Sequence, residues 1–135
     1  MLTASTPGLD SPRILVVDDE ETVRVVSKRM LEACGLSVLC ARDGAEGVEM
    51  FRERPMEITL VLLDMTMPRM SGEEAFREMR RIRPDVRVVL TSGYNEQEAT
   101  TRFTGKGLAG FIQKPFTHAS LLAKVREALE SGSVS

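Results

Sequence analysis

Short apolar runs alternate along this chain with segments whose apolar residues recur at helical spacing. The runs are rich in β-branched residues and too short for buried helices, so they indicate strands. Helical segments separate them and follow the last one, which gives five strands and five helices. The predicted strands are 14–17, 37–41, 58–63, 86–90 and 110–113.

The helical segments carry start and stop signals of their own. In the first, Val23, Val26 and Met30 form an apolar stripe, and Gly35 ends it. The fourth, near 95–103, has only a thin stripe, so we expect it to be the least stable element. The other signals are the capping pairs Asp43 with Glu46 and Ser71 with Glu74, the cap Thr117, and the final stripe Leu122, Val125 and Leu129.

Strict alternation of strand and helix predicts parallel strands joined by right-handed crossovers. Helices then cover both faces of the sheet, which explains why the strands are apolar throughout rather than on alternate residues. The sequence therefore predicts a single-domain, doubly wound α/β fold. A five-stranded parallel sheet of this kind has the strand order 2-1-3-4-5.

The composition is that of one soluble globular domain. The chain has 135 residues, of which 42% are hydrophobic and 28% charged. Residues 1–12 are rich in Ser, Thr, Pro and Gly and predict a flexible lead, while 131–135 predict a flexible tail. The folded domain is therefore expected over 13–130.

Net charge and apolar run length argue against two classes of partner. A formal net charge of −2 without a basic stripe disfavours direct binding to nucleic acid or to an anionic membrane. No apolar run approaches the roughly 20 residues that span a bilayer, and the first residues lack a secretory signal pattern. We expect a cytoplasmic protein.

Several residues that could carry chemistry have a plainer interpretation. Cys34 and Cys40 lack the spacing of a redox site and are expected to be reduced core residues. His118 is a lone histidine near a helix start, and we assign it no role. The three methionines Met65, Met67 and Met70 are interpreted as apolar filler around a loop.

The stretch ILVVDDEE, residues 14–21, takes a buried strand directly into four carboxylates. Glu20 and Glu21 fit a solvated helix start, where carboxylates are favoured. Asp18 and Asp19 call for more, because carboxylates held close together repel one another and need a cation. They are therefore candidates for a metal site.

Other polar residues follow the remaining strands. The functional crevice of an open parallel sheet lies at the carboxyl ends of its strands, next to the point where the strand order reverses. Strands one and three are neighbours there, which brings Asp18, Asp19 and Asp64 together. Thr91 and Ser92 follow the fourth predicted strand, and Lys114 follows the fifth, on the same edge.

Three carboxylates with room for water suit Mg²⁺, which binds through a few carboxylates plus a substrate phosphate. A phosphoryl group arriving at this edge would also need a cation and a hydroxyl donor for its remaining oxygens. Lys114 and Thr91 supply these groups. The sequence thus predicts a Mg²⁺-dependent phosphoryl site.

Four motifs in order, VVDDE, LLDMTMPRMSG, LTSGY and KPF, resemble the receiver domain of two-component response regulators, over about 13–129. The resemblance implies a flavodoxin-like fold with Asp64 as the phosphoacceptor. It implies Mg²⁺ bound by Asp19, by Asp18 mainly through water, by Asp64 and by the Thr66 backbone carbonyl. Lys114 and Thr91 would contact the phosphoryl group, with a cis bond from Lys114 to Pro115.

The resemblance also implies a switch, in which the Thr91 hydroxyl moves toward the phosphoryl group and Phe111 turns inward behind it. The face made by the fourth helix, fifth strand and fifth helix would then change its partners. A histidine kinase or histidine phosphotransfer protein would be the donor, and self-association on phosphorylation is a further expectation. Such a protein is no conventional enzyme, although it catalyses its own phosphorylation and dephosphorylation.

Other classes remain open at this point. A receiver-like docking module that acts without phosphate would keep the same fold. A Mg²⁺-dependent phosphatase is disfavoured because Thr66 stands where a second aspartate is needed, and a flavodoxin because no phosphate-binding loop follows the first strand. The chain could be a stand-alone regulator, but its motifs favour the receiver of a hybrid histidine kinase. We expect no DNA-binding output domain after the last helix.

Overall fold

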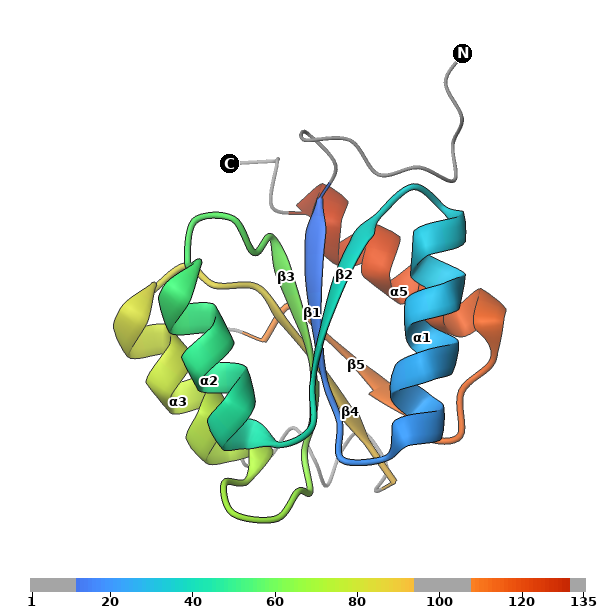
Figure 1. Ribbon diagram of the computed structural model, residues 1–135. Helices are drawn as coiled ribbons and strands as arrows, with labels where there is room; N and C mark the ends of the chain where they lie inside the picture. The colour runs from blue at the N-terminus through green and yellow to red at the C-terminus, as the bar shows by residue number, and fades with distance from the viewer. Residues whose placement is uncertain (1–11, 94–107, 132–135) are drawn as a thin grey trace.

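The computed structural model describes residues 12–93 and 108–131. Within these ranges the chain forms one five-stranded parallel sheet with helices on both faces (Figure 1). The strand order is β2-β1-β3-β4-β5, as predicted. The strands are β1 (Arg13–Val17), β2 (Ser37–Ala41), β3 (Leu60–Asp64), β4 (Val88–Ser92) and β5 (Gly110–Gln113).

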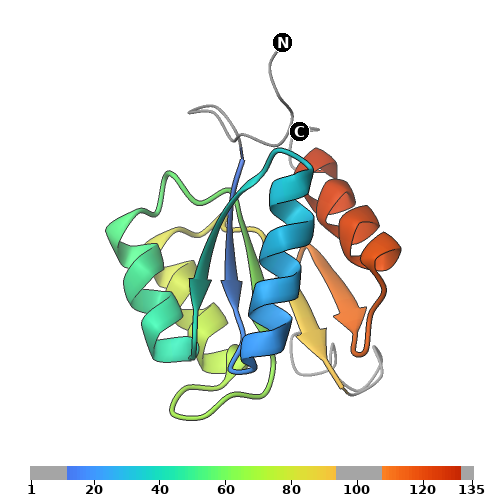
Figure 2. The ribbon, with the colours of Figure 1, turned by 45° about the vertical axis from the view of Figure 1, so that its right-hand side comes forward.

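Two pairs of helices sandwich the sheet. One pair packs on one face and the second pair on the other, as the two ribbon views agree (Figures 1 and 2). The first pair is α1 (Glu21–Ala33) and α5 (His118–Ser131), and the second is α2 (Gly44–Glu53) and α3 (Gly72–Ile82). The expected helix near 95–103, with its candidate core residues, lies outside the described residues.

Two apolar layers hold this arrangement together, one on each face of the sheet. Alternate residues of β1 illustrate the division, since Leu15 packs in the layer under α2 and α3, and Ile14 in the layer under α1 and α5. Both are fully buried. Burial on both faces explains the continuously apolar strands.

Two of the predicted strands, 58–63 and 86–90, begin two residues before the observed β3 and β4. Ile58 is buried, but its backbone N–H donates to the carbonyl of Arg54, so β3 begins at Leu60 and includes Asp64. Val86 is likewise buried while its N–H closes a turn onto Arg83. Burial alone makes both residues apolar, and only backbone pairing decides where a strand starts. Thr91 and Ser92 therefore lie within β4 rather than after it.

Two helix stripes were also placed one residue off. Ser27, Met30 and Leu31 are the buried residues of α1, whereas Val26 is 38% exposed. In α5 the buried positions are Leu121, Val125 and Ala128, flanked by partly buried Leu122 and Leu129.

The first helix ends where the sequence predicted, because Gly35 has a positive φ of 87°.

The capping predictions succeeded except in one detail. Ser71 and Glu74 form a complete capping box at the start of α3. Asp43 accepts from the Glu46 backbone N–H, but the Glu46 carboxylate accepts from the N–H of Arg42 instead of closing the box. Thr117 caps α5 by accepting from the N–H of Ser120 at 3.0 Å.

The two cysteines are reduced, as predicted, but neither is fully buried, although Cys40 packs against the layer under α1 and α5. Cys34 is exposed at the C-terminal end of α1, and Cys40 is half-buried on β2. Both are free thiols. Cys34 follows the last turn of the helix, where the chain leaves the packed face, so its apolar character did not place it inside.

Candidate functional site

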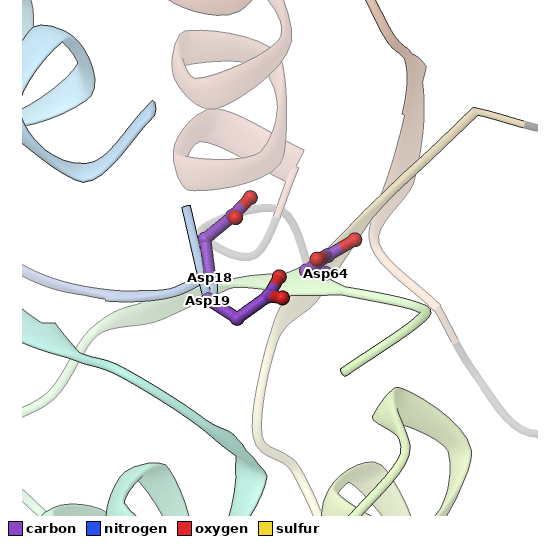
Figure 3. Close-up of side chains that lie close together, drawn as sticks. All are labelled: Asp18, Asp19 and Asp64. Atoms are coloured by element: carbon purple, nitrogen blue, oxygen red, sulfur yellow. The ribbon is translucent and has the colours of Figure 1, made fainter. Parts of the chain in front are cut away.

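Three aspartates converge at the carboxyl ends of β1 and β3. One carboxylate oxygen from each of Asp18, Asp19 and Asp64 lies within 4.8 Å of the other two (Figure 3). Asp18 and Asp64 are buried, whereas Asp19 is exposed at the mouth of the cluster. The predicted juxtaposition of these three residues is therefore present.

The parallel register accounts for this meeting. Val17 pairs with Leu63 across β1 and β3, so the next residues on each strand, Asp18 and Asp64, leave the sheet side by side. Asp64 pairs with Thr91 of β4, which is 3% exposed. Thr91 also accepts at its carbonyl from the N–H of Met65. Strand pairing thus sets the acidic cluster beside a buried hydroxyl.

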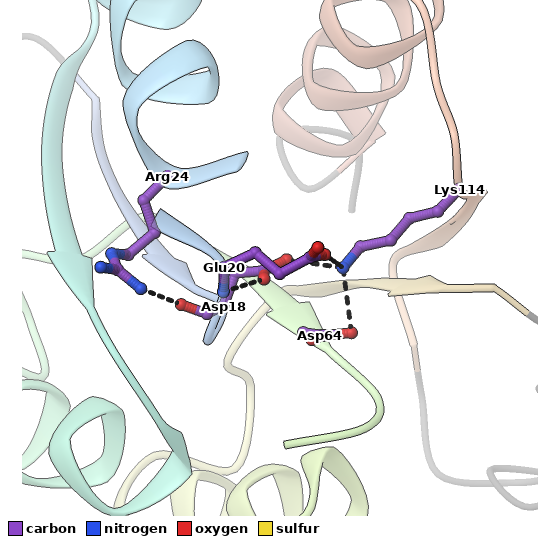
Figure 4. A network of polar contacts seen from close by, with 5 residues as sticks. All are labelled: Asp18, Glu20, Arg24, Asp64 and Lys114. Atoms are coloured by element: carbon purple, nitrogen blue, oxygen red, sulfur yellow. Dashed lines mark hydrogen bonds and ion pairs between the residues drawn. The ribbon is translucent and has the colours of Figure 1, made fainter. Parts of the chain in front are cut away.

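Lys114 reaches into the cluster from the end of β5. Its Nζ lies 2.8 Å from Asp18 Oδ2 and 3.4 Å from Asp64 Oδ1 (Figure 4). The same atom is 3.4 Å from Glu20 Oε1. The Lys114–Pro115 peptide bond is cis, as the sequence resemblance implied. A single ammonium therefore faces three carboxylates.

Burial and the neighbouring charges change the protonation of Asp64. The pKa of its carboxyl is raised from 3.8 to about 7, chiefly by burial and then by the nearby Asp18 charge, while Lys114 acts in the opposite direction. A hydrogen bond with the Asp19 side chain also favours the protonated form, whereas one from the Thr66 backbone favours the charged form. The pKa of Lys114 is raised by its three carboxylate partners, although burial alone would lower it.

An open cleft of about 470 Å³ gives access to these groups. It contains room for a hydrated cation and a phosphoryl group together. The residues that line it are Asp19, Glu20, Asp64, Thr66, Gly93 and Lys114.

The donor set fits a hard divalent cation. All three acidic ligands are oxygen donors, and a cation would offset the repulsion that raises the pKa of Asp64. Thr66, whose backbone carbonyl is the fourth predicted ligand, lines the same cleft. The residues present therefore suit Mg²⁺.

Three of the residues singled out in the sequence lie in the apolar layer under α2 and α3. Phe111 is 7% exposed and packs in the apolar layer under α2 and α3, so its ring is already turned inward. Met65 and Met67 belong to the same layer, which confirms their interpretation as filler.

The sequence interpretation missed Glu20. We assigned it to a solvated helix start, yet its carboxylate contacts Lys114 and lines the cleft. Its 63% exposed side chain does fit the solvated description. The direction of a surface side chain next to a helix start depends on where β5 ends in space, which no local pattern reports.

A doubly wound parallel sheet with an acidic cluster, a threonine and a lysine at its carboxyl edge defines a class of phosphoryl-binding signalling proteins. The model of the family described as response regulator receiver domain matches residues 14–126. The chain belongs to this receiver family.

Two relatives illustrate the range of proteins in which such domains occur. The chain is 33% identical over 118 residues to the chemotaxis protein CheY of Bacillus subtilis (strain 168), covering 87% of this chain and 97% of that protein. It is 35% identical over 120 residues to the sensor kinase CckA of Brucella abortus (strain 2308), covering 89% of this chain but 13% of the kinase. The chain thus spans a small part of one relative and nearly all of another.

Solved structures agree with this assignment. A response regulator receiver domain protein from Clostridium thermocellum superimposes with a TM-score of 0.84 at 31% identity, covering 91% of this chain and 98% of that one. The CheX-CheY-BeF3-Mg+2 complex from Borrelia burgdorferi gives a TM-score of 0.80 at 28% identity, covering 92% and 90%. Family membership removes the phosphatase and flavodoxin alternatives.

Among the described residues, none of the helices has the length and apolarity needed to cross a membrane.

Proposed function

We propose that this chain accepts a phosphoryl group from a phosphohistidine onto Asp64, with Mg²⁺ held at the acidic cluster, and switches its partner-binding face in response. The observation that carries the proposal is the convergence of Asp18, Asp19 and Asp64 around the ammonium of Lys114. The histidine would belong to a histidine kinase or a phosphotransfer protein, the partners typical of the family.

In the proposed transfer, a carboxylate oxygen of Asp64 attacks phosphorus while the bond from phosphorus to the histidine nitrogen breaks. The imidazole leaves with the electron pair of that bond and takes a proton from solvent. Dephosphorylation is the attack of water on the same phosphorus, which returns the carboxylate and releases phosphate. Such transfers ask the protein for positioning and for charge neutralisation.

Each site residue then has a distinct part. Asp19 and Asp64, with the Thr66 carbonyl, would hold the cation directly, and Asp18 would act through a bound water. The cation, when present, neutralises charge on the phosphoryl oxygens. Lys114 would pair with another phosphoryl oxygen, and the Thr91 hydroxyl would donate to one from the neighbouring strand.

The switch would follow from the last of these contacts. Moving Thr91 toward the phosphoryl group would leave space behind it, and the Phe111 ring, which is already buried, would repack into that space. Moving a two-state equilibrium from mostly off to mostly on takes about 5.5 kcal/mol of differential stabilisation. Contacts of Lys114 and Thr91 to the phosphoryl group are the proposed source.

A phosphate-independent docking module is the second candidate, because it would keep the same fold. The presence of the acceptor, the acidic pair, the threonine and the lysine together favours the receiver that is phosphorylated. Self-association on phosphorylation, a cytoplasmic location and an origin within a hybrid histidine kinase are further proposals. The match to part of the sensor kinase CckA supports the last of these.

The deciding experiment is the intact mass of the protein after incubation with acetyl phosphate and Mg²⁺. We expect the gain of one phosphoryl group, which is lost on adding a chelator and in Asp64→Asn. Undiminished labelling of Asp64→Asn would place the acceptor elsewhere. If neither acetyl phosphate nor a phosphohistidine protein labels the wild type, the docking module would be the better description.

A further inference from the structure

Arg24 of α1 reaches back to the loop that carries the acidic pair. Its Nη1 donates to the backbone carbonyl oxygen of Asp18 at 2.7 Å, in a partly buried position (Figure 4). The guanidinium lies on the opposite side of Asp18 from Lys114, so it faces away from Asp64. Arg24 therefore touches the site only through the backbone.

Asp18 is held from four directions. Its N–H donates to the carbonyl of Ala41 at 3.2 Å, and its Oδ1 accepts from the N–H of Glu20 at 2.9 Å. Its Oδ2 pairs with Lys114, and its carbonyl oxygen accepts from Arg24. Of these contacts, only the one from Arg24 acts on the peptide group that links Asp18 to Asp19.

That peptide group determines where Asp19 lies. A peptide bond is planar, so fixing the Asp18 carbonyl oxygen also fixes the position of the Asp19 nitrogen and restricts its Cα. Asp19 is the exposed member of the cluster, and among the described residues its carboxylate has no ion-pair partner and lies beside the other two carboxylates. Its carboxylate is therefore aimed mainly by its backbone.

We infer that Arg24 is a positioning residue for the divalent cation, which it serves by orienting the Asp18–Asp19 peptide so that the Asp19 carboxylate faces Asp64. The inference rests on the proposed function, in which the acidic cluster binds Mg²⁺. Residues that hold metal ligands in place from outside commonly contribute tenfold or more to metal affinity.

Charge and position predict opposite effects at this residue. Arg24 is a cation near a cation site, so removing its charge alone would strengthen Mg²⁺ binding. Releasing the peptide group would weaken binding, because the Asp19 carboxylate would sample orientations that miss the metal. The sign of the change therefore separates the two roles.

The test is calorimetric titration of Mg²⁺ into the full chain and its Arg24→Met variant, with Arg29→Met as the matched control. Arg29 is an exposed residue of the same helix, so its variant loses the same charge. We expect Arg24→Met to bind Mg²⁺ about 10-fold more weakly, and Arg29→Met to differ less than about twofold from wild type. Arg24→Lys, which keeps a donor, should recover part of the loss.

A second readout needs no metal. Amide NMR shifts of Asp19 and Glu20 in the metal-free protein should move in Arg24→Met and stay in place in Arg29→Met. Circular dichroism verifies folding, and Arg24→Gln, whose side chain is too short to reach the carbonyl, replaces Arg24→Met if that variant is unfolded.

Two outcomes would overturn the inference in distinguishable ways. A wild type that binds no Mg²⁺ at millimolar concentration would remove the proposed metal site and the role of Arg24 with it. A wild type that binds Mg²⁺, with Arg24→Met binding as tightly as Arg29→Met or more tightly, would leave the metal site standing and reject Arg24 alone. Arg24→Lys no tighter than Arg24→Met would also reject it, since the hydrogen bond would then not matter.

Discussion

Asp64 is the site residue whose ionisation is opposed both by burial and by a neighbouring negative charge. Its carboxyl is buried beside Asp18, and its pKa is about 7 in the metal-free protein. At neutral pH a proton and a divalent cation therefore compete for the same group. The chemistry proposed for Asp64 needs the carboxylate, so cation binding prepares the nucleophile as well as the phosphoryl site.

The raised pKa of Asp64 predicts how the free energy of unfolding of the metal-free protein depends on pH. Between about pH 4 and 7 the native carboxyl keeps its proton, whereas the unfolded one, with its ordinary pKa of 3.8, has lost it. The native state then binds more protons, so the contribution of Asp64 to the free energy of unfolding falls as pH rises through that window and levels off above it. Urea denaturation in a chelator, at pH 5, 6, 7 and 8, measures this slope.

Asp64→Asn is the control, since it should lack this part of the slope. An equal slope in wild type and variant would show that Asp64 does not titrate in this window. In wild type, Mg²⁺ affinity should rise from pH 6 to pH 8, because a proton has to leave before the carboxylate can bind the cation.

Lys114 is the second residue whose role is open to a direct test. Its ammonium is the one described cation next to Asp64, and it would meet a phosphoryl oxygen there. Replacing it by Met should slow phosphorylation by acetyl phosphate about 100-fold or more, as loss of an electrostatic donor does. Stopped-flow or mass-spectrometric kinetics at saturating Mg²⁺ measures the rate. A rate near wild type would show that the cation alone neutralises the transferred group.

At the scale of elements, the site depends on how closely α3 approaches β3. The first residue of α3, Gly72, has the carbonyl oxygen of Asp64 and the Cα of Met65 where a Cβ would stand. Its N–H also donates to the Met65 carbonyl at 2.9 Å. The loop after the acceptor can close only because this helix starts without a side chain.

Gly72→Ala should accordingly destabilise the fold. The neighbours are backbone atoms that cannot move aside cheaply, and crowding of this kind costs about 1–3 kcal/mol. Gly93→Ala is the matched control, because a Cβ there meets nothing within 4 Å. Its stability should stay within about 0.5 kcal/mol of wild type. Urea denaturation compares the two, and equal stability would contradict the packing argument.

At the scale of the whole molecule, a cation bound as proposed would link separate elements into one unit. Asp18 and Asp19 follow β1, Asp64 ends β3, and Lys114 follows β5, so the site exists only when the sheet is assembled. A cation that binds this assembly and not the unfolded chain must stabilise the fold. At 100 times its Kd the gain is about 2.7 kcal/mol.

Thermal unfolding at pH 8 with and without Mg²⁺ tests this linkage. We expect the midpoint to rise with Mg²⁺ in the wild type and to stay constant in Asp19→Ala. Na⁺ at matched ionic strength controls for general screening. A midpoint that rises equally in Asp19→Ala would place the stabilising cation at another site.

Much of the molecule could be predicted from local pattern. The strand order and the grouping of Asp18, Asp19 and Asp64 follow from the alternation of strand and helix, because the carboxyl ends of parallel strands all lie at one edge. The capping box of Ser71 and Glu74 follows from the spacing of these two residues. The apolar stretches beginning at Ile58 and Val86 show where such reasoning fails, since burial and strand pairing select the same residue types but not the same residues. Val26 shows a similar failure for helices, because shifting the buried stripe by one residue barely changes its fit to the sequence pattern.

The sequence by itself determined the fold class, the edge at which the site lies and the residue types that fill it. Only the tertiary structure decided which carboxylate meets Lys114, that Glu20 joins them and that Arg24 holds the Asp18 carbonyl. These contacts join residues from different loops, so their geometry depends on where β5 ends and where α1 begins in space. The pKa of Asp64 is likewise decided only by the tertiary structure, because it is set by burial and by charges that come together only in the folded chain.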